Sequence, residues 1–245
     1  MEVGQPTEPG ERVDLDEPSS IGGFFALHTG APGSGHTALS RLYGGDLTVL
    51  TTRVDRVASR LGTPERRVAA SIAHLGLAAR LWSTALGAAV LCGEFPDPAP
   101  DTLHWDPELG APTDLCWSGT QSRPGTVDAL REAVLEGQLI PLAEAVRADA
   151  RVSPRLLRGN AGSALAGALR ELVRWSRSQQ RPDVSRRAAE LAAGLLEHPE
   201  LSGTVRGPAL RRTTCCLYYR SPGGGLCGDC VFDSPPTAAG GTHGL

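Results

Sequence analysis

The sequence contains no lysine, and all 24 of its lysine or arginine positions are arginine. Schiff-base chemistry on a lysine amine and the lysine clamp of Walker-type nucleotide loops are therefore excluded. Aromatic residues make up only 4% of the 245 residues, and there is a single methionine. The net charge is −3, so the chain lacks the basic surplus with which proteins bind nucleic acid by charge. We expect no nucleic-acid partner.

Long hydrophobic runs are also missing. The most apolar stretch, Val68–Cys92, is interrupted by His74 and Arg80. Its longest uncharged piece, Leu81–Gly93, is shorter than the roughly 18–20 apolar residues of a spanning helix. Residues 1–20 are acidic and have no apolar core of the kind found in signal peptides. The sequence therefore predicts a cytoplasmic protein without a transmembrane segment, and it leaves peripheral membrane contact open.

The residues that are present favour a mainly helical α+β fold. Hydrophobic residues are 40% and charged residues 21% of the chain, which is typical of a globular protein. Apolar residues recur at helical spacing through most of the chain. The predicted helices span residues 46–61, 64–92, 126–136, 141–150, 160–178 and 184–197. Short strands are expected within Ile21–Thr29, at Leu103–Trp105 and at Leu115–Trp117.

Two helix starts are suggested by local signals. Thr63 is placed as an N-cap, with Pro64 at the first helical position, and the helix that follows is apolar on two sides. Such a helix is typical of the centre of a core. Asn160 is predicted to be the N-cap of a later helix. The glycine-rich loop Gly30–Thr37 is similar to a phosphate-binding loop. It lacks the lysine with which such loops bind the terminal phosphates, so we do not predict a nucleotide site there.

The expected organisation has four parts. Residues 1–20 are predicted to be a disordered acidic tail, and residues 21–205 a mainly helical scaffold domain. Residues 206–232 form a short C-terminal cysteine-rich segment, and residues 233–245 a second disordered tail.

The cysteine-rich segment carries the strongest chemical signal. It contains four of the six cysteines: Cys215, Cys216, Cys227 and Cys230. Cytosolic thiols stay reduced, so clustered cysteines indicate metal or redox chemistry rather than a structural disulfide. Four thiolates suit zinc or an iron–sulfur cluster. The adjacent pair is awkward for one zinc ion, because neighbouring side chains on an extended chain point to opposite sides. Iron–sulfur is favoured, while zinc and thiol–disulfide chemistry through Cys227 and Cys230 remain alternatives.

The stretch from Arg211 to Cys230 resembles the C-terminal signature of FhuF-type ferric-siderophore reductases: RRTTCCLYYRSPGGGLCGDC. In that family the adjacent cysteines and the C-x2-C pair together ligate a 2Fe–2S cluster. All four ligand positions match here, including the ten-residue gap. Weaker similarity lies upstream, in Ala79–Ser83, Phe95–Trp105 and Leu157–Ala161.

The resemblance implies an oxidoreductase that passes one electron through a 2Fe–2S cluster to the chelated iron(III) of a ferric siderophore, so that iron(II) is released in the cytoplasm. No flavin or nicotinamide site is evident in the sequence, so a separate electron-donor protein is expected as a partner. Arg211, Arg212 and Arg220 are expected to raise the cluster's reduction potential and to contact an anionic chelate. An electron carrier or redox sensor without a siderophore substrate is the main alternative, followed by a zinc-stapled interaction domain.

Three further residues are predicted to be structural. Cys92 and Cys116 are expected to be small buried hydrophobic side chains. His74, on the predicted central helix, is expected to be a core histidine with its hydrogen bonds satisfied rather than a ligand or proton donor.

Overall fold

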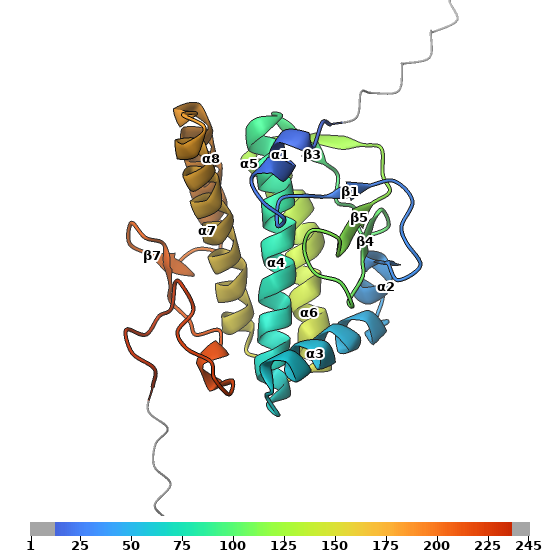
Figure 1. The fold of residues 1–245 in the computed structure, drawn as a ribbon, viewed down its shortest axis with the longest axis vertical. Coiled ribbons are helices and arrows are strands. Elements are labelled where there is room, and N and C mark those ends of the chain that lie inside the picture. Colours follow the sequence, from blue (N-terminus) through green and yellow to red (C-terminus); the bar gives the residue numbers. More distant parts are fainter. Residues whose placement is uncertain (1–12, 237–245) are drawn as a thin grey trace, which may run out of the picture.

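The computed structural model describes residues 13–236, and its architecture is centred on one long helix. This helix, α4, runs through the middle of the molecule, with α7 and α8 on one side and the small strands, α3 and α6 on the other (Figure 1). Within residues 13–236, no helix is both long enough and apolar enough to cross a membrane. The expectation of a mainly helical α+β fold is confirmed.

The helices are α1 (Asp16–Ser20), α2 (Leu39–Tyr43), α3 (Thr48–Leu61), α4 (Arg66–Leu91), α5 (Val127–Leu130), α6 (Ile140–Asp149), α7 (Pro154–Ser178) and α8 (Pro182–Leu196), with a π-helical stretch at Arg131–Leu139 and a short 3-10 turn at Tyr218–Arg220. The strands are β1 (His28–Thr29), β2 (Thr37–Ala38), β3 (Glu94–Pro96), β4 (Leu103–Trp105), β5 (Leu115–Trp117), β6 (Ser122–Pro124), β7 (Val205–Arg206) and β8 (Arg211–Arg212).

Helix α4 is buried on nearly every side, as its apolar pattern predicted. It begins at Arg66, with Glu65 rather than Thr63 as its N-cap. The Thr63 hydroxyl instead accepts a hydrogen bond from the Glu65 N–H at 3.3 Å, just outside the helix. The prediction of a central helix is confirmed, and that of its cap is corrected.

The strands form a small sheet in the order β1-β5-β4-β2. β4 and β5 pair antiparallel at the residues predicted, and every residue of β5 is buried, including Cys116. The strand expected within Ile21–Thr29 is reduced to His28–Thr29, which pairs parallel with β5. Cys116 is thus the core residue that its apolar setting indicated.

The N-terminal part of the chain departs from the predicted tail. Residues 1–12 lie outside the described residues, but Asp16–Ser20 forms helix α1, which packs against α4 and buries Pro18. The backbone carbonyl of Asp14 accepts a hydrogen bond from the Cys92 thiol at 3.2 Å. Cys92 itself is exposed rather than buried, because it follows the last turn of α4 and reaches the surface. Residues 237–245 of the predicted C-terminal tail also lie outside the described residues.

Two predicted helices prove to be one continuous helical run from Val127 to Asp149. Thr126 caps its start by accepting the Ala129 N–H at 3.2 Å. The π-helical stretch lies directly ahead of Pro141. Proline has no N–H to donate and clashes with the preceding turn of an α-helix, and a wider π-helical turn relieves both problems.

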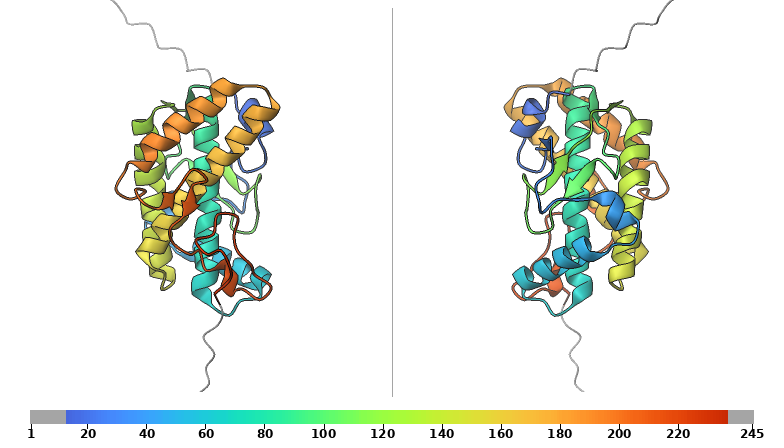
Figure 2. Two further views of the ribbon diagram at one scale, coloured as in Figure 1. Left: turned by 90° about the vertical axis from the view of Figure 1, so that its left-hand side faces the viewer. Right: turned by 90° about the vertical axis from the view of Figure 1, so that its right-hand side faces the viewer.

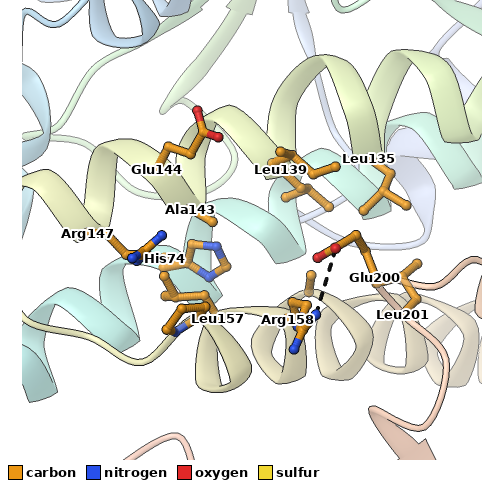
Figure 3. Close-up of a pocket in the computed structure, with 13 residues that line it drawn as sticks. His74, Leu135, Leu139, Ala143, Glu144, Arg147, Leu157, Arg158, Glu200 and Leu201 are labelled. Carbon is orange, nitrogen blue, oxygen red and sulfur yellow. Dashed lines mark ion pairs between the residues drawn. The ribbon is translucent and has the colours of Figure 1, made fainter.

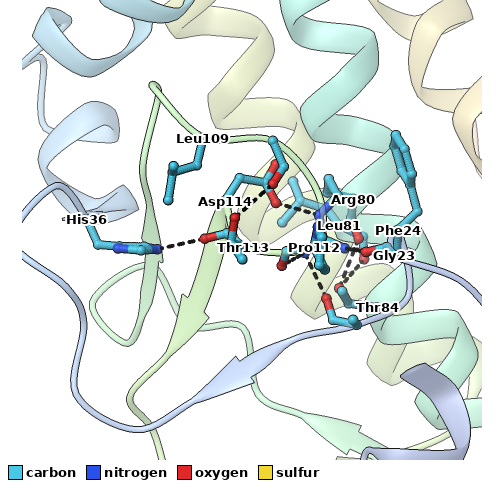
Figure 4. A network of polar contacts seen from close by, with 12 residues as sticks. Gly23, Phe24, His36, Arg80, Leu81, Thr84, Leu109, Pro112, Thr113 and Asp114 are labelled. Carbon is cyan, nitrogen blue, oxygen red and sulfur yellow. Dashed lines mark hydrogen bonds and ion pairs between the residues drawn. The ribbon is translucent and has the colours of Figure 1, made fainter. Parts of the chain in front are cut away.

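A buried ion pair joins α4 to the loops of the sheet (Figure 4). The Arg80 Nε donates to Asp114 Oδ1 at 2.8 Å, and both side chains are almost fully buried. The remaining nitrogens of Arg80 donate to backbone carbonyls in residues 23–26 and to that of Pro112. One guanidinium therefore fixes two irregular segments against the central helix.

Removing the carboxylate of this pair should cost much of the protein's stability. Asp114→Ala leaves the Arg80 charge buried without a counter-ion, and we expect a loss of about 3–5 kcal/mol in the free energy of unfolding, measured by urea titration. Glu171→Ala, which breaks the exposed pair with Arg174, is the control and should cost less than about 1 kcal/mol. Equal losses in the two variants would show that the buried Arg80–Asp114 pair does not stabilise the fold more than an exposed pair does.

Candidate metal centre

The cysteine segment lies against the central helices rather than apart from them. Its β7–β8 hairpin pairs Val205 with Arg212 and packs on α7, and the 3-10 turn at Tyr218–Arg220 packs on α4. The left view of Figure 2 shows the segment passing over the lower parts of both helices. The predicted C-terminal segment is therefore built onto the helical core.

The four cysteines of the segment divide into buried and half-buried members. Cys216 and Cys230 are 2% and 7% exposed, whereas Cys215 and Cys227 are half-buried and reach the surface. Among residues 13–236, no three His, Cys, Asp or Glu side chains come together closely enough to hold a single metal ion. The segment therefore has an inner and an outer side, and thiols lie on both.

The backbone after the adjacent pair points N–H groups at sulfur. Leu217 has a φ of 71°, a left-handed conformation that is uncommon for a branched residue. In this conformation the Leu217 N–H donates to Cys215 Sγ at 3.2 Å. A hydrogen bond from Cys227 lowers the pKa of Cys216 to about 7, against the opposing effect of burial, and the same contact together with burial raises the pKa of Cys227. The arrangement favours anionic sulfur at Cys216.

A glycine turn closes the loop between the two cysteine pairs. Gly223 has a φ of 70°, and a Cβ on Gly224 would overlap the backbone carbonyl of Tyr218. The Gly224 N–H donates to the Ser221 carbonyl at 2.8 Å. These glycines make the turn, and the N–H group that points at thiol sulfur comes from Leu217.

The C-x2-C pair is anchored through the aspartate that it encloses. Asp229 accepts a hydrogen bond from the Ser163 hydroxyl on α7 at 2.6 Å, and its other carboxylate oxygen lies 3.6 Å from Cys227 Sγ. The Cys230 N–H donates to the Cys227 carbonyl at 3.0 Å, which closes the turn. Ser163 lies in the middle of α7, so this pair is held by the helical core.

Two of the three arginines singled out in the sequence lie at the edge of the segment. Arg211 donates to the carbonyl of Cys230 and forms an ion pair with Asp233 at 2.8 Å. Arg220 donates from Nε to both carboxylate oxygens of Glu65, at 2.9 and 3.1 Å. These hydrogen bonds lower the pKa of Glu65, so its carboxylate stays ionised beside Arg220. Both arginines are partly exposed and fasten the segment in place.

The structure contradicts the prediction that Arg212 contacts a chelate. Its exposed fraction is 0%, so it is not placed to contact a chelate from solution. Its Nη2 donates to Asn160 Oδ1 at 2.6 Å and its Nε donates to the Thr214 carbonyl, while Nη1 is buried with no partner. Asn160, predicted as a helix cap, lies inside α7 and is itself fully buried. The helix begins at Pro154 instead, and the Asn160 amide serves tertiary contacts.

A separate cavity of about 280 Å³ lies between α4, α7 and the 127–149 helical run, with His74 in its lining (Figure 3). His74 is buried as predicted, but neither of its ring nitrogens has a hydrogen-bond partner among the described residues, and burial lowers its pKa to about 3. Helix α7 contributes Leu157 and Ala161 to this cavity, whereas its Gly159 and Asn160 meet the cysteine segment. The cavity and the cysteines therefore lie against different faces of α7.

Comparison with known proteins identifies the segment. Residues 212–232 match the FhuF 2Fe-2S C-terminal domain, and the four cysteines fit its motif. No curated protein matches the chain. The resemblance and the 2Fe–2S cofactor expected from the sequence are thereby confirmed: the chain is an iron–sulfur protein whose C-terminal segment is of the FhuF type.

The residues present fit such a cluster. Four thiols are available, the Leu217 N–H points at the sulfur atom of Cys215, and the cation of Arg212 is buried in the same segment without an ion-pair partner among the described residues. Each of these features favours anionic sulfur at this place. We propose that Cys215, Cys216, Cys227 and Cys230 hold the two irons, where the cluster supplies a one-electron centre.

The ligand set can be tested one cysteine at a time. Alanine at any of the four segment cysteines should abolish the visible absorption of the purified protein, because each iron needs all of its thiolates. Cys92→Ala and Cys116→Ala are the matched controls and should keep the absorption, with two irons and two sulfides per chain. A wild-type protein that carries one zinc and no iron would contradict the assignment.

The glycine turn provides a test of geometry. Gly224→Ala should lower the amount of cluster that the protein retains, since the new Cβ overlaps the Tyr218 carbonyl and must move the backbone between the cysteine pairs. Gly225→Ala is the neighbouring control, because a Cβ there has nothing within 4 Å. The measurement is iron content per folded chain. Similar retention in both variants would show that the turn does not set the distance between the pairs.

Proposed function

We propose that this protein is a ferric-siderophore reductase, which takes one electron from a donor protein and passes it to chelated iron(III) in the cytoplasm. Two observations support the proposal. The C-terminal segment matches a 2Fe–2S domain of the FhuF type. The thiols of Cys215 and Cys227 are half-buried at the outer side of that segment, where both a donor protein and a small chelate have access.

The electron balance of this reaction is simple. A 2Fe–2S cluster exchanges one electron at a time, and a reduced iron–sulfur or flavin protein supplies that electron. The electron converts iron(III) to iron(II), and no bond within the chelator is broken. A cation of lower charge attracts its oxygen ligands less strongly, so iron(II) leaves the chelate more readily than iron(III) does.

The chain's own residues govern how a chelate approaches. Since Arg212 is buried, the role of contacting an anionic chelate is left to the partly exposed Arg220 and Arg211. The carboxylate of Glu65 offsets part of the Arg220 charge, so we expect the attraction to be moderate and to depend on salt. An electron carrier or sensor would have no need of such a contact.

The proposal is tested anaerobically with the full-length protein. The cluster is reduced, a ferric hydroxamate or a ferric catecholate is added, and reoxidation is followed in the presence of a trap for iron(II). We expect reoxidation much faster than in buffer, with one iron(II) trapped per cluster oxidised, for at least one chelate class. Reoxidation no faster than in buffer for either class would favour the carrier or sensor instead.

The same assay tests the chelate contact. Arg220→Gln should slow the reaction with an anionic chelate by about three- to tenfold at low salt, and the difference should shrink at high salt because the charges are then screened. Arg174→Gln, which removes an exposed arginine from α7, is the control and should leave the rate unchanged. Equal slowing at both salt concentrations would assign Arg220 to anchoring alone.

A further inference from the structure

Two fully buried arginines are present in the described part of the chain, and they differ in one respect. Arg80 is 1% exposed and pairs with Asp114. Arg212 is 0% exposed, yet among residues 13–236 no carboxylate forms an ion pair with it. Burying a charge without a counter-ion is costly, and removal of a partner from a buried pair typically destabilises a protein strongly. The environment of Arg212 is therefore incomplete.

Asp229 pairs with Arg212 through its backbone, but its carboxylate is engaged elsewhere. The backbone carbonyl of Asp229 accepts the Arg212 N–H at 3.1 Å. The carboxylate of Asp229, however, accepts from Ser163 and lies 3.9 Å from the guanidinium of Arg170. Arg212 has only neutral partners, the Asn160 side chain and the Thr214 carbonyl, and one of its nitrogens has none.

The same guanidinium lies next to the adjacent cysteine pair in the chain. Its Nε donates to the backbone carbonyl of Thr214, the residue directly before Cys215. A 2Fe–2S cluster on four thiolates carries a charge of about −2 when oxidised and one unit more negative when reduced. Such an anion is what the buried cation lacks.

A chain of buried hydrogen bonds fixes Arg212 relative to the adjacent cysteine pair. Asn160 accepts from Arg212 through Oδ1, and its Nδ2 donates to the backbone carbonyl of Ser71 on α4 at 2.9 Å. The Ser71 hydroxyl donates to the Cys216 carbonyl at 2.8 Å. One asparagine thus connects the arginine, the central helix and a cysteine that we assign as a ligand.

We propose that Arg212 is the buried counter-cation of the cluster, and that Asn160 is the positioning residue that holds its guanidinium toward the sulfur atoms. This inference rests on the proposed ligand set but not on the siderophore substrate. It has two consequences of opposite sign. The arginine destabilises the chain without the cluster, because its charge is then uncompensated. It also stabilises the reduced state more than the oxidised one, and so raises the reduction potential.

The test compares Arg212→Gln with Arg212→Lys in two measurements that need no chelate. In the full-length chain without its cluster, Arg212→Gln should raise the melting temperature by about 3 °C or more, because an unpaired buried charge is removed. In the loaded protein, the same variant should lower the reduced-to-oxidised ratio at fixed potential at least tenfold, a drop of about 59 mV or more. Arg212→Lys keeps the charge and should stay within about threefold of the wild-type ratio.

Two more variants separate charge from packing. Arg174→Gln removes an exposed arginine from α7 and should change neither measurement. Asn160→Ala retains the Arg212 charge but frees its guanidinium, so it should lower the reduced-to-oxidised ratio by less than Arg212→Gln does. Equal shifts for Arg212→Gln and Arg212→Lys would overturn the proposal and make Arg212 a packing residue. A lower melting temperature of the cluster-free Arg212→Gln protein would overturn it as well. A siderophore assay that fails while these results hold would affect only the proposed substrate.

Discussion

The close approach of the cysteine segment to helix α7 is the constraint on which the arrangement of the site depends. Glycines of α7 lie at this contact: a Cβ on Gly159 would overlap the side chain of Thr214, and one on Gly162 would overlap that of Thr204, just before the segment. This spacing brings the Arg212 guanidinium within 2.6 Å of Asn160 and lets Ser163 reach Asp229. Glycine has a low helix propensity, so these residues weaken α7 as a helix but allow the cysteine segment to pack closely against it.

The arginines of the helical core and of the cysteine segment differ in burial and in their ion-pair partners. Arg80 and Asp114 form a closed pair that needs nothing further. Arg211 and Arg220 are paired near the surface, where such contacts contribute little energy but fix the segment in one orientation. Among the arginines of residues 13–236, only Arg212 combines full burial with neutral partners. These four arginines thus have three distinct environments.

Much of the fold could be predicted because its signals are local. The spacing of the four cysteines, the apolar pattern of α4 and the strands at Leu103–Trp105 and Leu115–Trp117 are all contained in short windows of sequence. The site's supports could not be predicted in this way. Asn160 is of a residue type that is common at helix N-caps. Its hydrogen-bond partners, however, are Arg212 and Ser71, which lie 52 and 89 residues away in the chain. No window that contains Asn160 shows either partner, and the stronger tertiary contacts decided its place.

The pair between Glu65 and Arg220 has a consequence for the order in which the molecule is made. It joins residues 155 positions apart, so the N-cap of the central helix receives this partner only when the cysteine segment has been synthesised. Since chains emerge from the ribosome N-terminus first, helices α1 to α8 are all translated before any of the four segment cysteines exists. Until the segment has been made, Glu65, Asn160 and Ser163 lack the partners that they have in the finished fold. A cluster held by all four segment cysteines can therefore be completed only after every one of these helices has been translated.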